Sequence, residues 1–236
     1  MGRANVSKKS FVYNVDMAFV IDATLSMDDL LDVVKKNAVN FYSDVCGVML
    51  KKNKQINKLR VRIIAFRDYI ADKNDAMLVT DFFDLPAQAH DFSDCVNDIE
   101  AMGGGDEPED GLEGLAYAIK SKWDTDKVTS DGKPIKHRHV IVVWSDASTH
   151  ELGFGKSEPN YPKNMAADMR ELTSWWDELM SAYSKRLVLF TPAEEGWATI
   201  GKTWDNTYLI PTVAGDGLQE VDYNQIINIV GGTISA

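Results

Sequence analysis

The first apolar run of the chain, Met17-Ala18-Phe19-Val20-Ile21, is short and continuous, which is typical of a strand buried on both faces. It predicts a strand over residues 11–21. Residues 27–51 then repeat apolar side chains at three- and four-residue spacing, which predicts one long helix. Residues 59–66 alternate and then become continuously apolar, which predicts a second strand. Residues 139–144 are the most strand-like segment of the chain.

The rest of the chain continues this alternation of strand and helix patterns. A strand at 77–83 follows a short polar loop, so we expect it to pair antiparallel at one edge of the sheet. Further strands are expected at 186–190 and 207–210, and helices at 86–101, 108–122, 164–183, 192–199 and 218–230. The pattern predicts an α/β fold of Rossmann-like type: a doubly wound, mainly parallel sheet with one antiparallel edge strand and helices on both faces. Without a convincing linker, residues 11–236 are predicted to form a single domain after a polar lead-in at 1–10.

Three side chains that carry oxygen follow the first strand at alternate positions: Asp22, Thr24 and Ser26. In an extended segment, residues two apart point the same way, so one carboxylate and two hydroxyls would face a single point. Such hard oxygen ligands suit Mg²⁺ or Mn²⁺ rather than zinc. Ser26 is also a candidate N-cap for the helix that begins at Met27.

Two later segments carry the same kind of chemistry. A glycine-rich acidic loop, Gly103 to Asp110, offers Asp106 as a ligand, with Glu107 as a competitor, although its acids could equally be helix N-terminal charge. Ser145-Asp146 follows the strand at 139–144. Because ligands of such sheets bind beyond the carboxyl ends of the strands, we expect all three segments to meet there.

In this order, the three segments resemble those of the von Willebrand factor type A domain and its metal-ion-dependent adhesion site. Asp22-Ala23-Thr24-Leu25-Ser26 is similar to the Asp-x-Ser-x-Ser motif of that family, and the Gly-Gly-Gly-Asp-Glu-Pro-Glu-Asp loop resembles intracellular members, including those joined to alpha-kinases. The resemblance implies direct metal contacts from Thr24 and Ser26, and largely water-mediated ones from Asp22 and Asp146. Asp106 would replace a threonine of the family.

The resemblance also bears on the partner. In the family, a carboxylate of the bound protein often completes the metal shell. Three carboxylates from Asp22, Asp106 and Asp146 would leave about one net negative charge on a divalent cation, which draws an acidic group less strongly. We therefore expect a well-occupied site that prefers a neutral or water-bridged partner.

Composition narrows the function. The net charge of −11 argues against a nucleic-acid partner, and the chain has no run of about 18 apolar residues that would insert into a membrane. Cys46 and Cys95 are predicted to be buried thiols, and no signal-peptide pattern begins the chain, so a cytoplasmic location is expected. His150 is interpreted as a surface loop residue, and Arg67-Asp68 as a turn or a partner contact on the same rim.

These observations favour a non-enzymatic protein-binding module that depends on a divalent cation, acts within a larger intracellular assembly and binds its partner at the metal-bearing rim of the sheet. One alternative is a magnesium-dependent phosphoryl-transfer enzyme of the haloacid dehalogenase type, which also begins with an aspartate after the first strand. Such enzymes need an acid/base two residues later, where this chain has Thr24. The other alternative is a metal-stabilised structural scaffold.

Overall fold

The computed structural model describes residues 11–104, 108–194, 196–218 and 222–235. Its central strand, β1 (Val12–Asp22), is buried at every position. β1 pairs in parallel with β2 (Ile56–Phe66) on one side and with β5 (Ile135–Trp144) on the other. β6 (Lys185–Thr191) and β7 (Thr207–Pro211) continue the parallel sheet, in the order β3-β2-β1-β5-β6-β7. The order reverses between β1 and β5, which creates a switch point at their carboxyl ends.

The edge beyond β2 is antiparallel, as predicted, but it consists of two short strands. β3 (Met77–Val79) pairs with the last part of β2, and β4 (Phe83–Leu85) pairs with its first part. Between them, the Thr80 N–H donates to the Ile63 carbonyl, and the Thr80 hydroxyl accepts from the Ile63 N–H, so a side chain supplies half of the next rung. The predicted fold class, a mainly parallel α/β sheet with an antiparallel edge, is confirmed.

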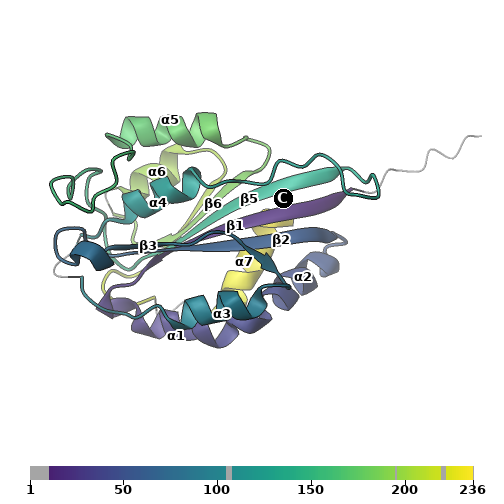
Figure 1. The fold of residues 1–236 in the computed structure, drawn as a ribbon, viewed down its shortest axis with the longest axis horizontal. Coiled ribbons are helices and arrows are strands. Elements are labelled where there is room, and N and C mark those ends of the chain that lie inside the picture. Colours follow the sequence, from purple (N-terminus) through teal and green to yellow (C-terminus); the bar gives the residue numbers. More distant parts are fainter. Residues whose placement is uncertain (1–10, 105–107, 195, 219–221, 236) are drawn as a thin grey trace, which may run out of the picture.

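Helices cover both faces of the sheet (Figure 1). The lower layer in that view contains α1 (Asp28–Asn37), α2 (Phe41–Lys51), α3 (Ala89–Asn97) and α7 (Tyr223–Ser235), and the upper layer contains α4 (Gly111–Ile119), α5 (Met169–Leu179) and α6 (Trp197–Thr203). Alternate residues of β1 serve the two cores: Met17, Phe19 and Ile21 pack below, whereas Ala18 and Val20 pack above.

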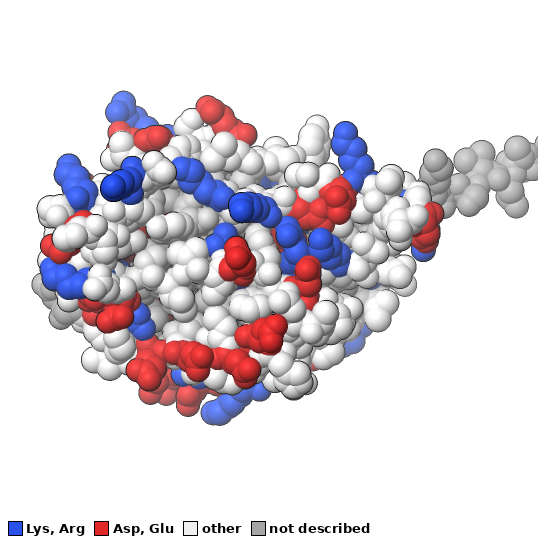
Figure 2. All heavy atoms as spheres, viewed as in Figure 1, with Lys and Arg blue, Asp and Glu red and all other residues white. Residues whose placement is uncertain are grey.

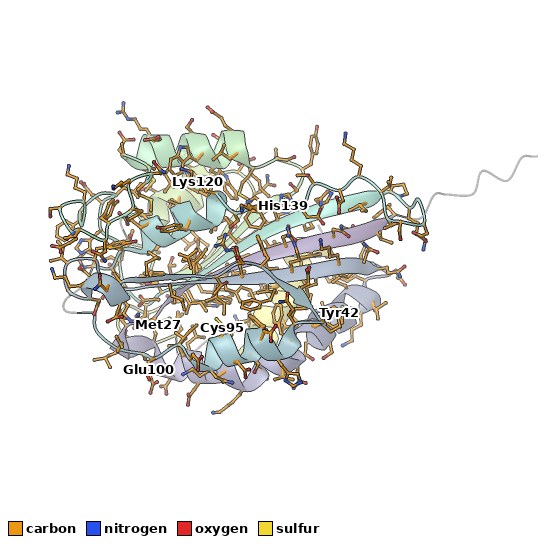
Figure 3. The ribbon with its side chains drawn as sticks, in the orientation of Figure 1. Met27, Tyr42, Cys95, Glu100, Lys120 and His139 are labelled. Atoms are coloured by element: carbon orange, nitrogen blue, oxygen red, sulfur yellow. The ribbon has the colours of Figure 1, made fainter. Side chains whose placement is uncertain are left out.

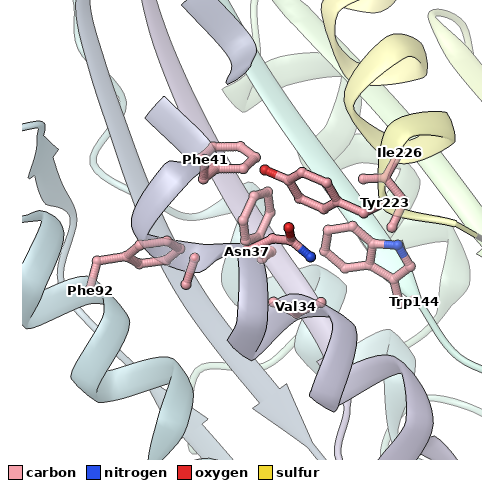
Figure 4. Close-up of a pocket in the computed structure, with 9 residues that line it drawn as sticks. Val34, Asn37, Phe41, Phe92, Trp144, Tyr223 and Ile226 are labelled. Atoms are coloured by element: carbon pink, nitrogen blue, oxygen red, sulfur yellow. The ribbon is translucent and has the colours of Figure 1, made fainter. Parts of the chain in front are cut away.

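The long helix predicted at 27–51 is interrupted. A 3₁₀ turn at Leu25–Met27 precedes α1, and a second one at Ala38–Asn40 separates α1 from α2. Asn37 donates its side-chain amide to the Val33 carbonyl, and such local side-chain bonds weaken a helix interior. Beside this break, Asn37 lines a cavity of about 20 Å³ with the rings of Phe41, Trp144 and Tyr223 (Figure 4).

Several other predicted boundaries were wrong. α3, α4 and α5 are shorter than the helices predicted at 86–101, 108–122 and 164–183. α6 begins at Trp197 instead of 192, because Gly196 has a φ of 89°, which no helix can contain. α7 spans Tyr223–Ser235 instead of 218–230, because Gly217 and Leu218 both have positive φ values and form a turn.

Two other side chains are placed less deeply than expected. Cys46 and Cys95 are free thiols, as predicted, but both are half-buried; Figure 3 shows Cys95 in the lower helical layer. Among the described residues, no helix combines the length and the apolar character that crossing a bilayer requires. On the face shown in Figure 2, acidic side chains gather over the lower helices, where α3 carries the exposed Asp91 and Asp94.

Candidate metal site at the switch point

Asp22, the last residue of β1, lies fully buried with both carboxylate oxygens engaged. Its Oδ1 accepts hydrogen bonds from the Thr24 N–H (3.0 Å) and the Thr24 hydroxyl (2.6 Å). Its Oδ2 accepts from the Ser145 hydroxyl at 2.7 Å. Ser145 directly follows β5, so this one carboxylate joins the ends of the two central strands.

Ser26 and Asp146 extend the same network. The Ser26 hydroxyl donates to Asp146 Oδ1 at 2.9 Å and lies 3.4 Å from the Thr24 hydroxyl oxygen. Asp146 Oδ2 accepts from the Gly217 N–H at 2.8 Å. The prediction that Ser26 caps a helix was wrong: α1 has no side-chain cap, and the Ser26 hydroxyl is turned toward Asp146 instead.

The spacing of these oxygens matches the demands of a small dication. Mg²⁺ binds oxygen at about 2.0–2.1 Å in octahedral geometry, so neighbouring ligand atoms lie about 2.9 Å apart. The three contacts that join Asp22, Thr24, Ser26 and Asp146 measure 2.6, 3.4 and 2.9 Å. Two carboxylates and two hydroxyls are therefore already placed about one octahedron edge apart, and a small rotation of the hydroxyls would direct their lone pairs at a cation.

The glycine-rich loop also reaches this site. A Cβ added to Gly104 would lie 2.6 Å from Thr24 Cγ2, so only glycine allows the loop to approach so closely, and its φ of 70° also favours glycine. Asp106 and Glu107, the two candidates for a ligand from this loop, lie outside the described residues. Whether either binds metal stays a prediction.

Glu109, from the same loop, was interpreted only as helix N-terminal charge, and the structure gives it a different place. Its N–H donates to the Ser148 carbonyl and its carbonyl accepts from the His150 N–H, which fixes it against the segment after β5. The position of a Gly104 Cβ lies 2.8 Å from Glu109 Oε1 and 2.6 Å from Thr24 Cγ2. No local sequence pattern distinguishes Glu109 from the other acids of this loop.

The site contains buried carboxyl groups whose ionised form is costly without a cation. Burial, followed by the charge of Asp22, raises the pKa of Glu109 to about 9. Burial also raises the pKa of Asp22 to about 6, although its hydrogen bonds to Thr24 and Ser145 oppose this shift. Within the described part of the chain, no Lys or Arg forms an ion pair with Asp22, Glu109 or Asp146. A bound cation would supply the missing positive charge.

A cage made of carboxylates alone is not present. Among the described residues, no three His, Cys, Asp or Glu side chains are grouped closely enough to hold a metal ion. The candidate site pairs two carboxylates, Asp22 and Asp146, with two hydroxyls, and both kinds of group are oxygen ligands for Mg²⁺. The residues therefore fit a hard dication and do not fit a zinc-type cluster.

Of the two alternatives for Arg67-Asp68, the turn agrees with the structure, because the Asp68 carbonyl accepts from the Asp72 N–H in the loop after β2. Arg67 itself is buried and donates to the carbonyls of Ala23, Asp75, Glu100 and Met102, so the partner-contact alternative was wrong for this side chain. His150 is not a freely exposed loop residue, because its Nε2 lies 3.0 Å from Asp68 Oδ2 and its side chain is only 12% exposed. Both residues hold neighbouring loops in place around the site.

The fold and the site together define a class: a doubly wound α/β protein with an oxygen-lined crevice at the switch point of its sheet. Residues 16–130 match the family model of the von Willebrand factor A domain. This match covers just under half of the chain, and the chain shares the mainly parallel, doubly wound sheet of von Willebrand factor A-like folds.

Individual proteins show the same similarity. Alpha-protein kinase vwkA of Dictyostelium discoideum is 26% identical over 148 residues, which cover 63% of this chain. The chain spans only about a fifth of that relative, 21% of its length. The fold is similar to that of the pilus adhesin SpaC of Lactobacillus rhamnosus GG (TM-score 0.54, 11% identity), and the match covers 97% of this chain and 31% of the adhesin. A second match is to a von Willebrand factor type A protein of Catenulispora acidiphila (TM-score 0.51, 14% identity), and it covers 92% of this chain and 42% of that protein.

Proposed function

We propose that this chain is a non-catalytic protein-binding module whose binding depends on Mg²⁺ or Mn²⁺ held by Asp22, Thr24, Ser26 and Asp146. The observation that supports it most directly is the convergence of these four oxygen ligands from two strand ends. The cation would neutralise the buried carboxylates and offer a coordination position at the rim. We expect the module to act in the cytoplasm within a larger assembly.

The surroundings of the site suit a protein partner. Leu25 lies between two of the proposed ligands and is 66% exposed. Val213, Phe154 and Ile70 are also large exposed apolar residues, in loops that follow the carboxyl ends of β7, β5 and β2. Carboxyl ends of parallel strands share one edge of the sheet, so these side chains lie around the same rim. Exposed apolar groups within a polar rim are typical of protein interfaces.

The phosphoryl-transfer alternative fits the geometry less well. A nucleophilic aspartate needs a free carboxylate oxygen, but both oxygens of Asp22 accept hydrogen bonds, from Thr24 and Ser145. Thr24 also stands where an acid/base would be required, and its hydroxyl donates to Asp22 itself. A phosphatase assay with a generic substrate tests this directly: turnover that Asp22→Asn abolishes would overturn the binding-module proposal.

Metal binding is tested by titrating metal-free protein with Mg²⁺ and Mn²⁺ in a calorimeter. We expect saturable binding to the wild-type protein that Asp22→Asn and Ser26→Ala each weaken strongly. Asp94→Asn, which removes an exposed carboxylate on α3, is the matched control and should bind as the wild type does. Absent metal binding by the wild-type protein would refute the proposal.

Partner binding is tested by affinity capture from a lysate of the source organism. The immobilised wild-type protein should retain a partner in Mg²⁺ and release it in EDTA, and Asp22→Ala should not retain it in either. A protein that binds metal in the calorimeter but captures the same proteins with and without EDTA would favour the scaffold alternative.

A further inference from the structure

The Glu109 carboxylate is buried, and among the residues that the structure describes it has no partner for its charge. The residue is only 3% exposed, and no described group donates a hydrogen bond to its Oε2. A buried ionised carboxylate in this state is costly, so it needs either a proton or a cation. The surrounding charges increase the cost, because Asp22, Asp68, Asp72 and Asp110 all act on Glu109 electrostatically.

The position of Glu109 indicates which of these it receives. A Cβ added to Gly104 would lie 2.6 Å from Thr24 Cγ2 and 2.8 Å from Glu109 Oε1, so both side chains lie next to this glycine. Glu109 Oε1 therefore lies beside the methyl group of Thr24, at the border of the candidate site, and the nearby charge of Asp22 acts on the Glu109 carboxyl. Its backbone is anchored by two hydrogen bonds to the segment 148–150, so the carboxylate is held in place from the β5 side.

We propose that Glu109 is a constituent of the metal centre and binds the cation through a bridging water held by its Oε2. This inference rests on the proposed metal site at Asp22, Thr24, Ser26 and Asp146. A bridging water agrees with the absence of three clustered carboxylates among the described residues, because an outer-sphere ligand need not touch the metal. It also supplies a donor to the unpartnered oxygen.

The proposal has a consequence for the partner. Asp22, Asp146 and Glu109 together carry three negative charges against two on the cation, so the occupied centre remains negative by about one charge. An acidic group of a partner would be repelled. A neutral oxygen, such as a backbone carbonyl or a side-chain amide, is then the group that the open coordination position accepts.

The test is Glu109→Gln, which removes the charge and keeps the shape. In titrations of metal-free protein with Mn²⁺, we expect the affinity to fall about 10- to 100-fold, the usual effect of removing an outer-sphere partner. Water-proton relaxation of the Mn²⁺ complex should change as well, because the variant no longer holds the bridging water in the same way. In EDTA, urea unfolding should show the variant to be at least as stable as the wild type.

Glu113→Gln is the matched control. Glu113 is also buried on α4, and among the described residues its Oε2 is unpartnered too, but its Oε1 accepts from the Gly153 N–H and the Tyr161 hydroxyl. Its Mn²⁺ affinity should equal that of the wild type. Glu109→Asp, which withdraws the carboxylate by one methylene, provides a second variant and should also bind Mn²⁺ more weakly.

The outcomes separate the two proposals. If Glu109 carries only a proton, Glu109→Gln replaces it isosterically and binds Mn²⁺ like the wild type, which overturns this inference and leaves the metal site standing. If the wild-type protein itself does not bind Mn²⁺, the proposed function fails, and this inference fails with it.

Discussion

Arg67 offers the sharpest test of how the loops around the candidate site are held. The residue is 7% exposed, and its guanidinium forms no ion pair with a carboxylate among the described residues. Instead, Nε donates to the Ala23 and Met102 carbonyls at 2.9 and 3.0 Å, and the terminal nitrogens donate to Asp75 and Glu100 at 2.6 Å each. One side chain thus ties the turn after β1 to the start of the glycine-rich loop.

The magnitude follows from these bonds. A hydrogen bond to a charged group contributes about 1.5–3 kcal/mol, and an acceptor left buried without a donor costs about 1–3 kcal/mol. Because Nε shares one N–H between two carbonyls, three donors are lost in Arg67→Met, and we expect a loss of about 3–5 kcal/mol. Arg67→Lys keeps a charge but not the planar fork, so we expect it to lose about 1.5–3 kcal/mol.

The measurement is urea unfolding in EDTA, followed by circular dichroism, with the slope compared among variants so that a changed midpoint reports stability. Arg170→Met is the control, because the Arg170 side chain is 93% exposed and its removal should change stability by less than about 0.5 kcal/mol. If Arg67→Met lowered the free energy of unfolding by less than about 1 kcal/mol, the hydrogen bonds from the Arg67 guanidinium to these carbonyls would not be what holds the loops together.

Two further predictions concern the site directly. Gly217→Ala would place a Cβ 2.2 Å from the Ser26 carbonyl oxygen, at a φ of 60°, so it should reduce both stability and Mg²⁺ affinity. A Cβ added to Gly47 on α2 would have no atom within 4 Å, so Gly47→Ala should instead stabilise the protein by about 0.5–1 kcal/mol. If both variants changed the urea midpoint equally, this reasoning would be contradicted. Without metal, stability should fall as the pH rises from about 4 to about 7, since burial raises the pKa of Asp22 to about 6 and that of Asp110 to about 7. The folded state then holds protons that the unfolded chain has released, so its advantage is present at low pH and lost as these groups ionise. Urea midpoints in EDTA that rise with pH would refute this, and added Mg²⁺ should reduce the loss by replacing the protons.

The hydrophobic pattern was sufficient for the strands of the sheet because each strand is buried and short. β1 and β5 lie close to their predicted positions, and so do their polar ends, Asp22 and Ser145-Asp146. Helix boundaries were less accurate. The break at Ala38–Asn40 depends on how Asn37 bonds to its own backbone, and apolar spacing continues through it unchanged.

The candidate site shows where local pattern stops being informative. Asp22, Thr24 and Ser26 could be predicted as a group, because extended backbone places alternate side chains on one side. Glu109 and Arg67 could not, since a loop residue's direction depends on what the loop packs against. Glu109 is positioned by the segment after β5, and Arg67 by carbonyls up to 44 residues away in sequence.

The order of apolar and polar residues by itself determined the α/β class, the parallel core and the oxygen-bearing side chains at the strand ends, because these depend on spacing within one segment. Tertiary structure alone decided that Ser26 meets Asp146, 120 residues away, and that the buried Glu109 carboxylate borders Thr24. Contacts of this kind depend on strand register and loop packing, which bring distant segments together only when the whole sheet has formed.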